Sequence, residues 1–481
     1  MVGTGPRSLA PLLDGWRTAG EPAFRSLAAR VRLLAVDGRL ASGSRLPAER
    51  ELAAALGVSR TTVSAAYAQL RVSGHLESTR GSGSVVRLPP APGGRGRAPV
   101  VLDLTRAVLP CAPQVHAAAV RAAAELPARA AAGSGYDLVG LPELRELVAA
   151  RYTARGLPTR ADEVLVTPGA QAAIGLLART LTSPGDRVLV ESPTYPHALD
   201  ALRAVGARPV AVPVRAPGAR DAGGWDEEAL EGAFARTRPS LAHLMPSFHN
   251  PTGAVMPPGQ RRAVVELARR YGTRLVVDET TAELAIDGPA PGPFPADAVH
   301  VGSVAKTLWG GLRIGWVRAD ARTVRHLAQH RSPWELGTAV LDQLVVAHAL
   351  PELDDVLATR REQLRAGRDA LLGLLAAHLP GWGLPRVAGG FCAWVELGSE
   401  SSSALVTAAR RRGLHLTAGP RFGLDGAFER FLRVPYGYGT GVLERAVPVL
   451  AEAWAEVRTD GADGAGGLDG AGGPGQPGDV V

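Results

Sequence analysis

The residue with the clearest chemical potential is Lys306. It is the only lysine among 481 residues, so the other 53 − 1 = 52 residues in the Lys+Arg count are arginine. Arginine stays protonated at any accessible pH, whereas a lysine amine can lose its proton and attack a carbonyl carbon. Lys306 is therefore a candidate for a Schiff base with an aldehyde cofactor. The alternative is one surface lysine retained by chance, and composition alone does not decide between the two.

The neighbours of Lys306 favour pyridoxal phosphate (PLP) as that cofactor. The lysine lies in the segment SVAKTLWGGLRIGW, with Ser303 three residues before it and Arg313 seven residues after it. A hydroxyl and a guanidinium at these positions can hold a phosphate while the lysine reaches the aldehyde carbon at the other end of the cofactor. The two consecutive glycines between them permit a close backbone turn.

Residues suited to the rest of a PLP ring precede the lysine. Asp278 ends the run LVVD, 306 − 278 = 28 residues earlier, and offers an anion for the pyridine nitrogen. The segment TPGAQ at 167–171 follows a predicted strand and opens a predicted helix, where free N–H groups favour an anion. Tyr195 offers an aromatic face to the ring, and Asn250 in HNPTG offers a donor to its hydroxyl. Each signal is weak alone, but together and in this order they predict a PLP site.

Residues 101–458 resemble the fold-type I aminotransferases through these motifs. The resemblance implies that Lys306 is the catalytic Schiff-base lysine and that Asp278 is the partner of the pyridinium. The other implied site residues are Gly169, Ala170, Gln171, Ser303 and Arg313 around the phosphate, Asn250 at the ring hydroxyl, Tyr195 stacked on the ring, and Arg433 at a substrate α-carboxylate. Tyr136 matches a residue that reaches the phosphate of the partner subunit, which implies a homodimer. No metal is expected.

Two positions depart from the family pattern. The family usually has a tyrosine two residues after the strand aspartate, where this chain has Thr280. A shorter hydroxyl puts catalytic tuning in doubt more than cofactor binding. Two residues after the stacking tyrosine stands His197, where some relatives place an arginine for a second ligand carboxylate. This departure argues against a dicarboxylate or γ-amino acid ligand.

The pattern of elements from residue 101 onward predicts an α/β fold. Short β-branched runs alternate with helical patterns such as 171–181 and 260–271, which is typical of a mostly parallel sheet covered by helices. The predicted strands are 163–166, 187–191, 209–214, 241–246, 274–278 and 299–303. A largely helical stretch begins near residue 321, and smaller strands are predicted at 387–397, 414–417 and 431–434.

The N-terminal part differs from this body in charge. Residues 1–99 contain 14 arginines and 6 acidic residues, a balance of 14 − 6 = +8, so the remainder sums to 7 − 8 = −1. A small basic module on a near-neutral body suggests a polyanion partner for that module. A solvated arginine-rich surface remains the alternative on charge alone.

The order of elements in the basic module predicts a winged helix-turn-helix. Helical patterns at 24–36, 48–56 and 59–73 are followed by two short extended runs, 76–79 and 85–88, with the turn GSG between them. The third helix begins with Ser59, a good N-cap, and its first turn suits recognition of base edges and phosphates. The predicted DNA-binding residues are Arg45, Arg50, Ser59, Arg60, Thr61, Thr62, Gly81 and Gly83.

This module resembles the GntR family of bacterial regulators over residues 24–88. The segment GSRLPAERELA at 43–53 is similar to the family's signature, and LGVSRTTV at 56–63 continues the match. One departure is Ala48, where the family often has a serine cap. Its loss costs about 1 kcal/mol of helix capping.

Five segments follow from these patterns: a flexible N-terminus (1–23), the winged helix (24–88), a Pro/Gly-rich linker (89–100), the PLP domain (101–458) and a disordered Gly/Asp-rich tail (459–481). We find no apolar run long enough to span a membrane and no signal-peptide pattern. Cys111 and Cys392 are far apart and are expected to be buried free thiols. These features fit the cytoplasm.

A GntR-like head joined to an aminotransferase-like body resembles the MocR-type regulators. The first hypothesis is a PLP-dependent transcription regulator that binds promoter DNA and senses an amine, amino acid or vitamer. The second is a working aminotransferase that carries a DNA-binding head. A third makes the body a sensor that has lost its cofactor.

Overall fold

The computed structural model describes residues 5, 9–13, 16–17, 22–36, 40, 43–79, 83–87, 101–218, 223–424 and 426–463. Contacts divide the chain into two compact units. The larger comprises residues 102–402 and 415–447, and the smaller comprises 1–101, 403–414 and 448–481. The linker predicted at 89–100, Gly81 and residues 464–481 of the predicted tail lie outside the described residues.

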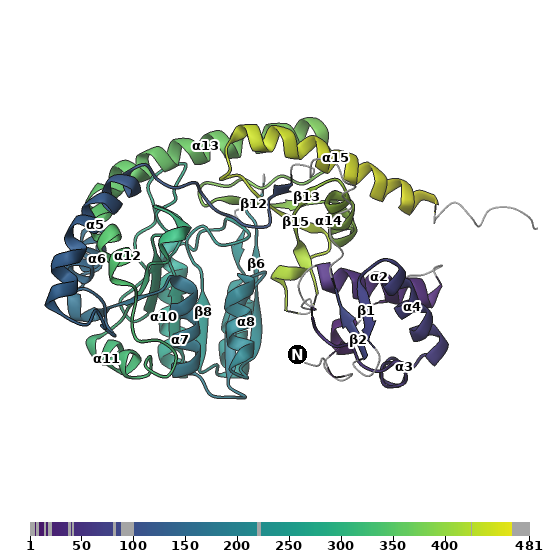
Figure 1. Cartoon of the computed structure of the whole chain (residues 1–481), viewed down its shortest axis with the longest axis horizontal. Helices are drawn as coiled ribbons and strands as arrows, with labels where there is room; N and C mark the ends of the chain where they lie inside the picture. The colour runs from purple at the N-terminus through teal and green to yellow at the C-terminus, as the bar shows by residue number, and fades with distance from the viewer. Residues whose placement is uncertain are drawn as a thin grey trace, which may run out of the picture. The chain divides into compact units, whose positions relative to one another are not determined.

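Within the described residues, the larger unit is built on an eight-stranded sheet of order β4-β11-β10-β9-β8-β5-β6-β7 (Figure 1). The strands are β4 (Val164–Thr167), β5 (Arg187–Ser192), β6 (Arg208–Arg215), β7 (Gly224–Trp225), β8 (Leu241–Leu244), β9 (Arg274–Asp278), β10 (Val299–Ser303) and β11 (Gly315–Arg318). The pairs from β10 to β6 are parallel, whereas β11 and β7 run antiparallel to their neighbours. The predicted mostly parallel sheet is confirmed.

Alternating side chains of the strands pack into two layers of helices. In β5, Val188 and Val190 join a buried cluster with α7 (Ala170–Leu181), α8 (Pro196–Ala204) and α11 (Ala321–Gln329). Leu189 points the other way, into a cluster with α9 (Glu227–Thr237) and α10 (Pro258–Tyr271). Because successive side chains of a strand face opposite sides, a fully apolar run marks a strand that is covered on both faces.

A third cluster fills the region around β4 with three further helices. These are α5 (Gln114–Ala132), α6 (Pro142–Ala154) and α12 (Val340–Ala349). The chain continues through the long helix α13 (Leu353–His378) to a small sheet of order β12-β15-β14. Its strands are β12 (Cys392–Glu396), β14 (Thr417–Ala418) and β15 (Phe431–Pro435), while the two-residue strand β13 (Leu414–His415) pairs with β3 (Leu102–Asp103).

The last two helices are α14 (Ser402–Arg411) and α15 (Thr440–Asp463). They are joined by ion pairs from Arg411 and Arg412 to Glu456. The helix α15 continues to Asp463, past the boundary at 458 where the sequence predicted a disordered tail to begin. The domain limits drawn from sequence otherwise stay predictions.

The head formed by residues 22–87 has the predicted helices and wing. The helices are α2 (Ala23–Val36), α3 (Glu49–Leu56) and α4 (Arg60–Val72), and the antiparallel wing is β1 (Leu76–Thr79) with β2 (Gly83–Val86). The tight turn after α3 uses Gly57, whose φ of 63° is left-handed, a conformation that glycine adopts without strain. The Tyr67 hydroxyl donates to the carbonyl of Pro47 at 3.0 Å and ties α4 to the segment before α3.

The prediction of a flexible N-terminus was wrong for part of residues 1–23. Leu9, Leu13 and Trp16 are buried in the same apolar cluster as the three head helices, and a short 3-10 turn, η1 (Pro11–Leu13), carries one of them. The scattered Gly and Pro residues hid this contribution, because three apolar anchors in irregular structure leave no periodic pattern.

Candidate functional site

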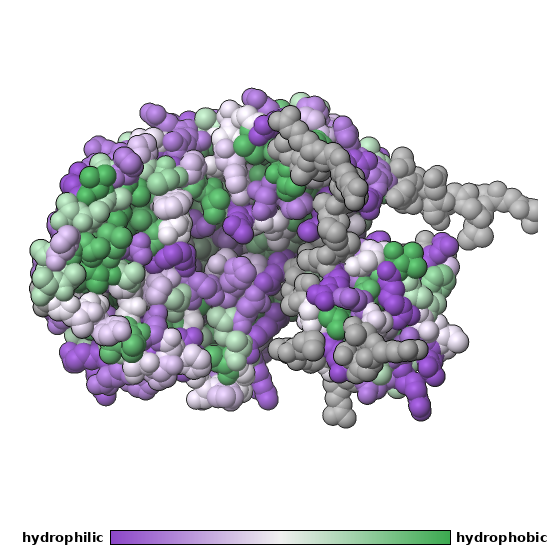
Figure 2. Space-filling view, viewed as in Figure 1, coloured by the Kyte–Doolittle hydropathy of each residue, from purple (hydrophilic) through white to green (hydrophobic). Residues whose placement is uncertain are grey.

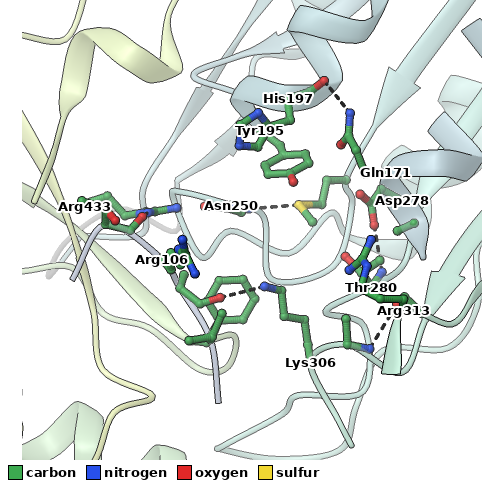
Figure 3. Close-up of a pocket in the computed structure, with 18 residues that line it drawn as sticks. Arg106, Gln171, Tyr195, His197, Asn250, Asp278, Thr280, Lys306, Arg313 and Arg433 are labelled. Atoms are coloured by element: carbon green, nitrogen blue, oxygen red, sulfur yellow. Dashed lines mark hydrogen bonds between the residues drawn. The ribbon is translucent and has the colours of Figure 1, made fainter. Parts of the chain in front are cut away.

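Most of the residues predicted from sequence to bind a cofactor meet in one pocket of the larger unit. The cavity has a volume of about 270 Å³ and lies where β4, β5, β8, β9 and β10 end. Figure 3 shows side chains from these loops pointing toward a common space. The lining includes Ala170, Gln171, Tyr195, Asn250, Asp278, Ser303, Lys306, Arg313 and Arg433. Parallel strands present their carboxyl ends at one edge, where ligands of α/β folds bind.

The side-chain amine of Lys306 is oriented in the pocket by a hydrogen bond to the backbone. Nζ donates to the carbonyl of Ala107 at 2.7 Å and lies 5.0 Å from the centre of the Phe391 ring. Burial, and next the charge of Arg433, lower the pKa of Lys306 from 10.5 to about 8. About a fifth of the amine is therefore neutral at pH 7.4, and the neutral amine is the state that attacks an aldehyde.

Asp278 is a buried carboxylate at the end of β9, 1% exposed. Its Oδ1 accepts the backbone N–H of Thr280 at 2.9 Å, and the Thr280 hydroxyl also bonds to this carboxyl. Burial raises the pKa of Asp278, opposed mainly by His243. Among the described residues Asp278 has no ion-pair partner, so a cation placed in the pocket would offset the desolvation of this carboxylate.

Tyr195 and Asn250 lie on loops after β5 and β8. Burial raises the pKa of Tyr195 to about 12, which keeps the phenol protonated. The Asn250 side-chain oxygen lies 3.7 Å from Cys392 Sγ, which donates to it. The backbone N–H of Asn250 donates to Met245 Sδ at 3.2 Å, whereas its side-chain nitrogen Nδ2 has no hydrogen bond to any described residue and is free to donate into the pocket.

The start of α7 forms a close-packed cradle beside Arg313. A Cβ added to Gly169 would come within 2.6 Å of the Arg313 guanidinium, and one added to Gly315 would come within 2.7 Å of the Ala170 nitrogen. Arg313 donates to the carbonyl of Pro168 at 3.0 Å. The first N–H groups of the 12-residue helix and the guanidinium therefore face one small space, as an anion requires.

Ser303 lies beside this cradle but its hydroxyl is engaged. It donates to the carbonyl of Ile314 at 2.8 Å and accepts the N–H of Ala305 at 3.1 Å. A phosphate would compete with the first of these bonds. Gln171 also lines the pocket: its Nε2 donates to the carbonyl of His197 at 2.9 Å, while its Oε1 is buried without a partner.

Arg433 lies on β15, 6% exposed. It donates to the carbonyl of Thr105, and its guanidinium carbon lies 4.9 Å from the centre of the Phe422 ring. Its Nε is buried without a hydrogen-bond partner. A buried, incompletely paired guanidinium is suited to a carboxylate ligand.

Two predicted cofactor residues are not among those that line the pocket. Gly169 is the N-cap of α7 directly before Ala170, and Tyr136 is 74% exposed and outside the pocket of its own chain. Sequence reasoning missed three residues near the pocket. Arg106 lies between β3 and α5 and lines the pocket. His243 lies on β8 and lowers the pKa of Asp278, and Cys392 begins β12 and interacts electrostatically with Lys306. None stood in a recognisable motif; His243 alone had a signal, as a histidine inside an apolar strand run.

These residues fit PLP. Four separate features each match a different part of that cofactor. They are a desolvated amine, a buried carboxylate without a cation, an unpartnered amide donor and a cradle that a Cβ would fill.

Among the described residues there is no group of His, Cys, Asp and Glu able to hold a metal ion. No helix in that part of the chain is long and apolar enough to cross a membrane.

A second candidate site is the first turn of α4 in the head. The Ser59 hydroxyl caps the helix by accepting the N–H of Thr62 at 3.1 Å, and it lies 2.7 Å from the hydroxyl of Thr61 and 2.8 Å from that of Thr62. The Arg60 side chain is 69% exposed and forms a 3.8 Å ion pair with Glu49. The turn therefore presents three hydroxyls and a loosely held guanidinium to solvent.

The other predicted DNA-binding residues that the structure describes lie outside this turn, on α3, on the segment before α3 and on the wing. Arg50 is exposed on α3. Arg45 forms a β-bridge with Val85, and its guanidinium packs where a Cβ on Gly83 would stand, 2.7 Å away. Ala48 caps α3 without a side-chain bond, as its residue type dictates, and only Glu51 reaches back to its N–H, at 3.3 Å.

Family models and relatives match both parts of the chain. The family "Aminotransferase class I and II" matches residues 110–450, and "Bacterial regulatory proteins, gntR family" matches residues 24–86. The chain belongs to the class I and II aminotransferase family and carries a gntR-family head. This family is PLP-dependent, and the resemblance to MocR-type regulators is confirmed by the combination of the two parts.

Three comparisons illustrate the match. The chain is 25% identical to an uncharacterized HTH-type transcriptional regulator, YisV of Bacillus subtilis, over 91% of this chain and 96% of that one. It is 33% identical to the probable rhizopine catabolism regulatory protein MocR of Rhizobium meliloti, over 63% and 66%. The structure of LysN, an α-aminoadipate aminotransferase of Thermus thermophilus, superimposes with a TM-score of 0.68 at 27% identity, covering 75% of this chain and 93% of that one.

The lowered pKa of Lys306 predicts how the apoprotein takes up PLP with pH. Because the neutral amine attacks, the uptake rate should rise about tenfold per pH unit below the pKa and level off above about pH 8. Stopped-flow absorbance between pH 6 and 10 measures this profile. The variant Arg433→Gln removes a neighbouring cation and should move the plateau to higher pH. A wild-type rate that still climbs tenfold between pH 9 and 10 would show an ordinary lysine.

Proposed function

We propose that this protein is a PLP-dependent transcription regulator whose aminotransferase-like body binds PLP and an amine or amino acid, and whose head binds promoter DNA. The observation that supports this proposal is that one chain contains both a pocket around Lys306 that fits PLP and an exposed helix turn at Ser59–Thr62. Such a regulator acts where the chromosome lies, so a cytoplasmic location is part of the proposal.

Each pocket residue has one part in binding the cofactor. Lys306 would hold the aldehyde carbon, Asp278 the pyridinium, and Arg313 with the start of α7 the phosphate. Tyr195 would stack on the ring and Asn250 would donate to its hydroxyl. When bound, PLP supplies an aldehyde that reacts reversibly with amines and a ring that draws electrons from them. Arg433 would orient the carboxylate of an amino acid at this aldehyde.

A working aminotransferase is the second candidate, because a buried amine able to move a proton, a pyridinium partner and a carboxylate clamp are all present. The geometry of Thr280 favours the regulator. Both its N–H and its hydroxyl bond to Asp278, so this residue does not supply the phenol donor that the family usually has near the ring hydroxyl. Turnover of several per second with a panel of amino acids would favour the enzyme.

The direct test is DNA footprinting upstream of the protein's own gene, with apoprotein, PLP-loaded protein and loaded protein plus candidate amines. A sensor changes the footprint or its midpoint when ligand is added, since differential binding to two states shifts their populations. The control is Lys306→Ala, which retains the head but should lose the response. A footprint identical in every condition would contradict sensing, and no footprint would contradict promoter binding.

A homodimer is also part of the proposal. Exposed apolar side chains gather on one side of the larger unit, where α5 packs on α12 and a bridge from Asp137 to Gly337 brings two loops together. Figure 2 shows hydrophobic surface over the α5 region. The exposed residues are Val120, Tyr136, Trp309, Trp334, Leu336 and Leu341. Large exposed apolar patches mark interaction sites, because monomeric soluble proteins rarely expose them. A second copy of the chain would carry Tyr136 toward the neighbouring pocket.

The dimer predicts a light-scattering mass near twice the chain mass of 49.9 kDa. Leu341→Arg should lower that mass toward the monomer, because a charge without a partner is costly inside an interface. The matched control is Val72→Arg, which changes a 91% exposed valine of the head and should leave the mass unchanged. Monomeric wild-type protein at micromolar concentration would contradict the dimer.

Arg60→Ala should weaken operator binding by about 1–3 kcal/mol and relax base preference at one position, because a guanidinium in the recognition turn reads a base edge. Arg50→Ala should weaken binding to all sequences and flatten the salt dependence, as a phosphate contact does. Arg25→Ala on α2 is the control. Fluorescence anisotropy with operator and random duplexes at several salt concentrations measures both. Equal losses on both duplexes for Arg60→Ala would make it a phosphate contact.

A further inference from the structure

The pocket contains more cationic side chains than would pair with the phosphate of PLP and the α-carboxylate of an amino acid. Its lining includes the cations Arg106, Lys306, Arg313 and Arg433, against a single carboxylate, Asp278. Under the proposed function, the phosphate pairs with Arg313, an α-carboxylate pairs with Arg433, and the pyridinium pairs with Asp278. The guanidinium of Arg106 is then left without an anion.

Hydrogen bonds hold the backbone around Arg106, whereas its guanidinium is unpaired among the described residues. The Tyr438 hydroxyl donates to its carbonyl, and the preceding residue Thr105 is fixed by N–H and hydroxyl bonds to Asp103 Oδ1, at 2.9 and 2.6 Å. Its guanidinium forms no hydrogen bond or ion pair with any described residue. Asp103 is an acid in electrostatic range of it.

Arg106 and Arg433 lie on the same side of the pocket. Both cations act on the pKa of Tyr438, which burial raises to about 12, and each of them lowers it. Figure 3 shows the Arg106 side chain near Arg433 and directed toward the space above Lys306. A ligand whose α-carboxylate meets Arg433 would therefore carry a distal group past Arg106.

His197 stands where some relatives place an arginine for a second ligand carboxylate. In this chain it pairs with a carboxylate of the protein itself. His197 lies 3.5 Å from Asp200, which Arg421 also pairs with. Burial opposes ionisation of Asp200, but these two partners hold its pKa at about 2. His197 thus already has a carboxylate partner in Asp200, and Arg106, the pocket cation that no described residue pairs with, is on a different element.

We infer that Arg106 binds the second carboxylate of an amino dicarboxylate effector, a step that rests on the proposed function and names its ligand class. An arginine fork matches a carboxylate in geometry and charge, and here the fork is free to rotate into place. The neutral isosteres of such ligands lack the charge that Arg106 would pair with.

The test is a titration of the PLP-loaded full-length protein, followed by calorimetry and by the visible band of the cofactor. The probes are two isosteric pairs, L-glutamate with L-glutamine and L-aspartate with L-asparagine. We expect at least one acid to bind about tenfold more tightly than its amide, since only the acid forms an ion pair with Arg106. Arg106→Gln should abolish that preference and leave the affinity for the amide unchanged.

The control variant is Arg160→Gln, a 69% exposed arginine outside the pocket, which should keep the preference. Acid and amide binding equally to wild type, or Arg106→Gln weakening both alike, overturns the role of Arg106 alone. A protein that shows no visible band with PLP overturns the proposed function itself, and the inference with it. Arg106→Lys, which keeps the charge but not the fork, should retain part of the preference.

Discussion

The desolvation of one amine is the constraint on which the rest of the pocket depends. Burial of Lys306, followed by the charges of Arg433 and Arg313, lowers its pKa to about 8. Asp278 opposes this shift and would itself be stabilised by a pyridinium. The pocket therefore holds a reactive amine and a carboxylate that lacks a cation. One PLP molecule would supply an aldehyde for the amine and a pyridinium for the carboxylate.

The parallel sheet brings these groups together. Asp278 and Ser303 end adjacent strands, and Tyr195, Asn250 and the start of α7 follow others. These positions are separated by up to 303 − 170 = 133 residues, yet they meet because parallel strands all end at one edge. The same logic explains why the motif order in sequence was informative: each strand contributes one loop to the site.

Much of the sheet and the pocket was predictable from sequence, since β9 and β10 were predicted at their observed bounds and the helices of the head within one residue or so. Buried strands and capped helices leave local patterns. The antiparallel strand β11 was missed because its first two residues, Gly315 and Trp316, belong to the lysine motif and a four-residue strand is too short to show a period. Leu9, Leu13 and Trp16 were missed because irregular segments have no period at all.

Long-range partners were beyond the reach of the sequence. Nothing local indicates that Thr280 turns its hydroxyl to Asp278, that Arg106 faces the pocket, or that Asp200 and Arg421 occupy the surroundings of His197. Such contacts depend on which loops the sheet places side by side. They are also the contacts that separate one ligand class from another within a shared fold.

The central claim is a covalent bond between the Lys306 nitrogen and the PLP aldehyde. Borohydride reduction of the PLP-loaded protein, followed by peptide mass mapping, tests it most directly. The account predicts one reduced pyridoxyl adduct, on the peptide that contains Lys306, and none after Lys306→Ala. An adduct elsewhere, or none on that peptide from protein incubated with excess PLP, would contradict it.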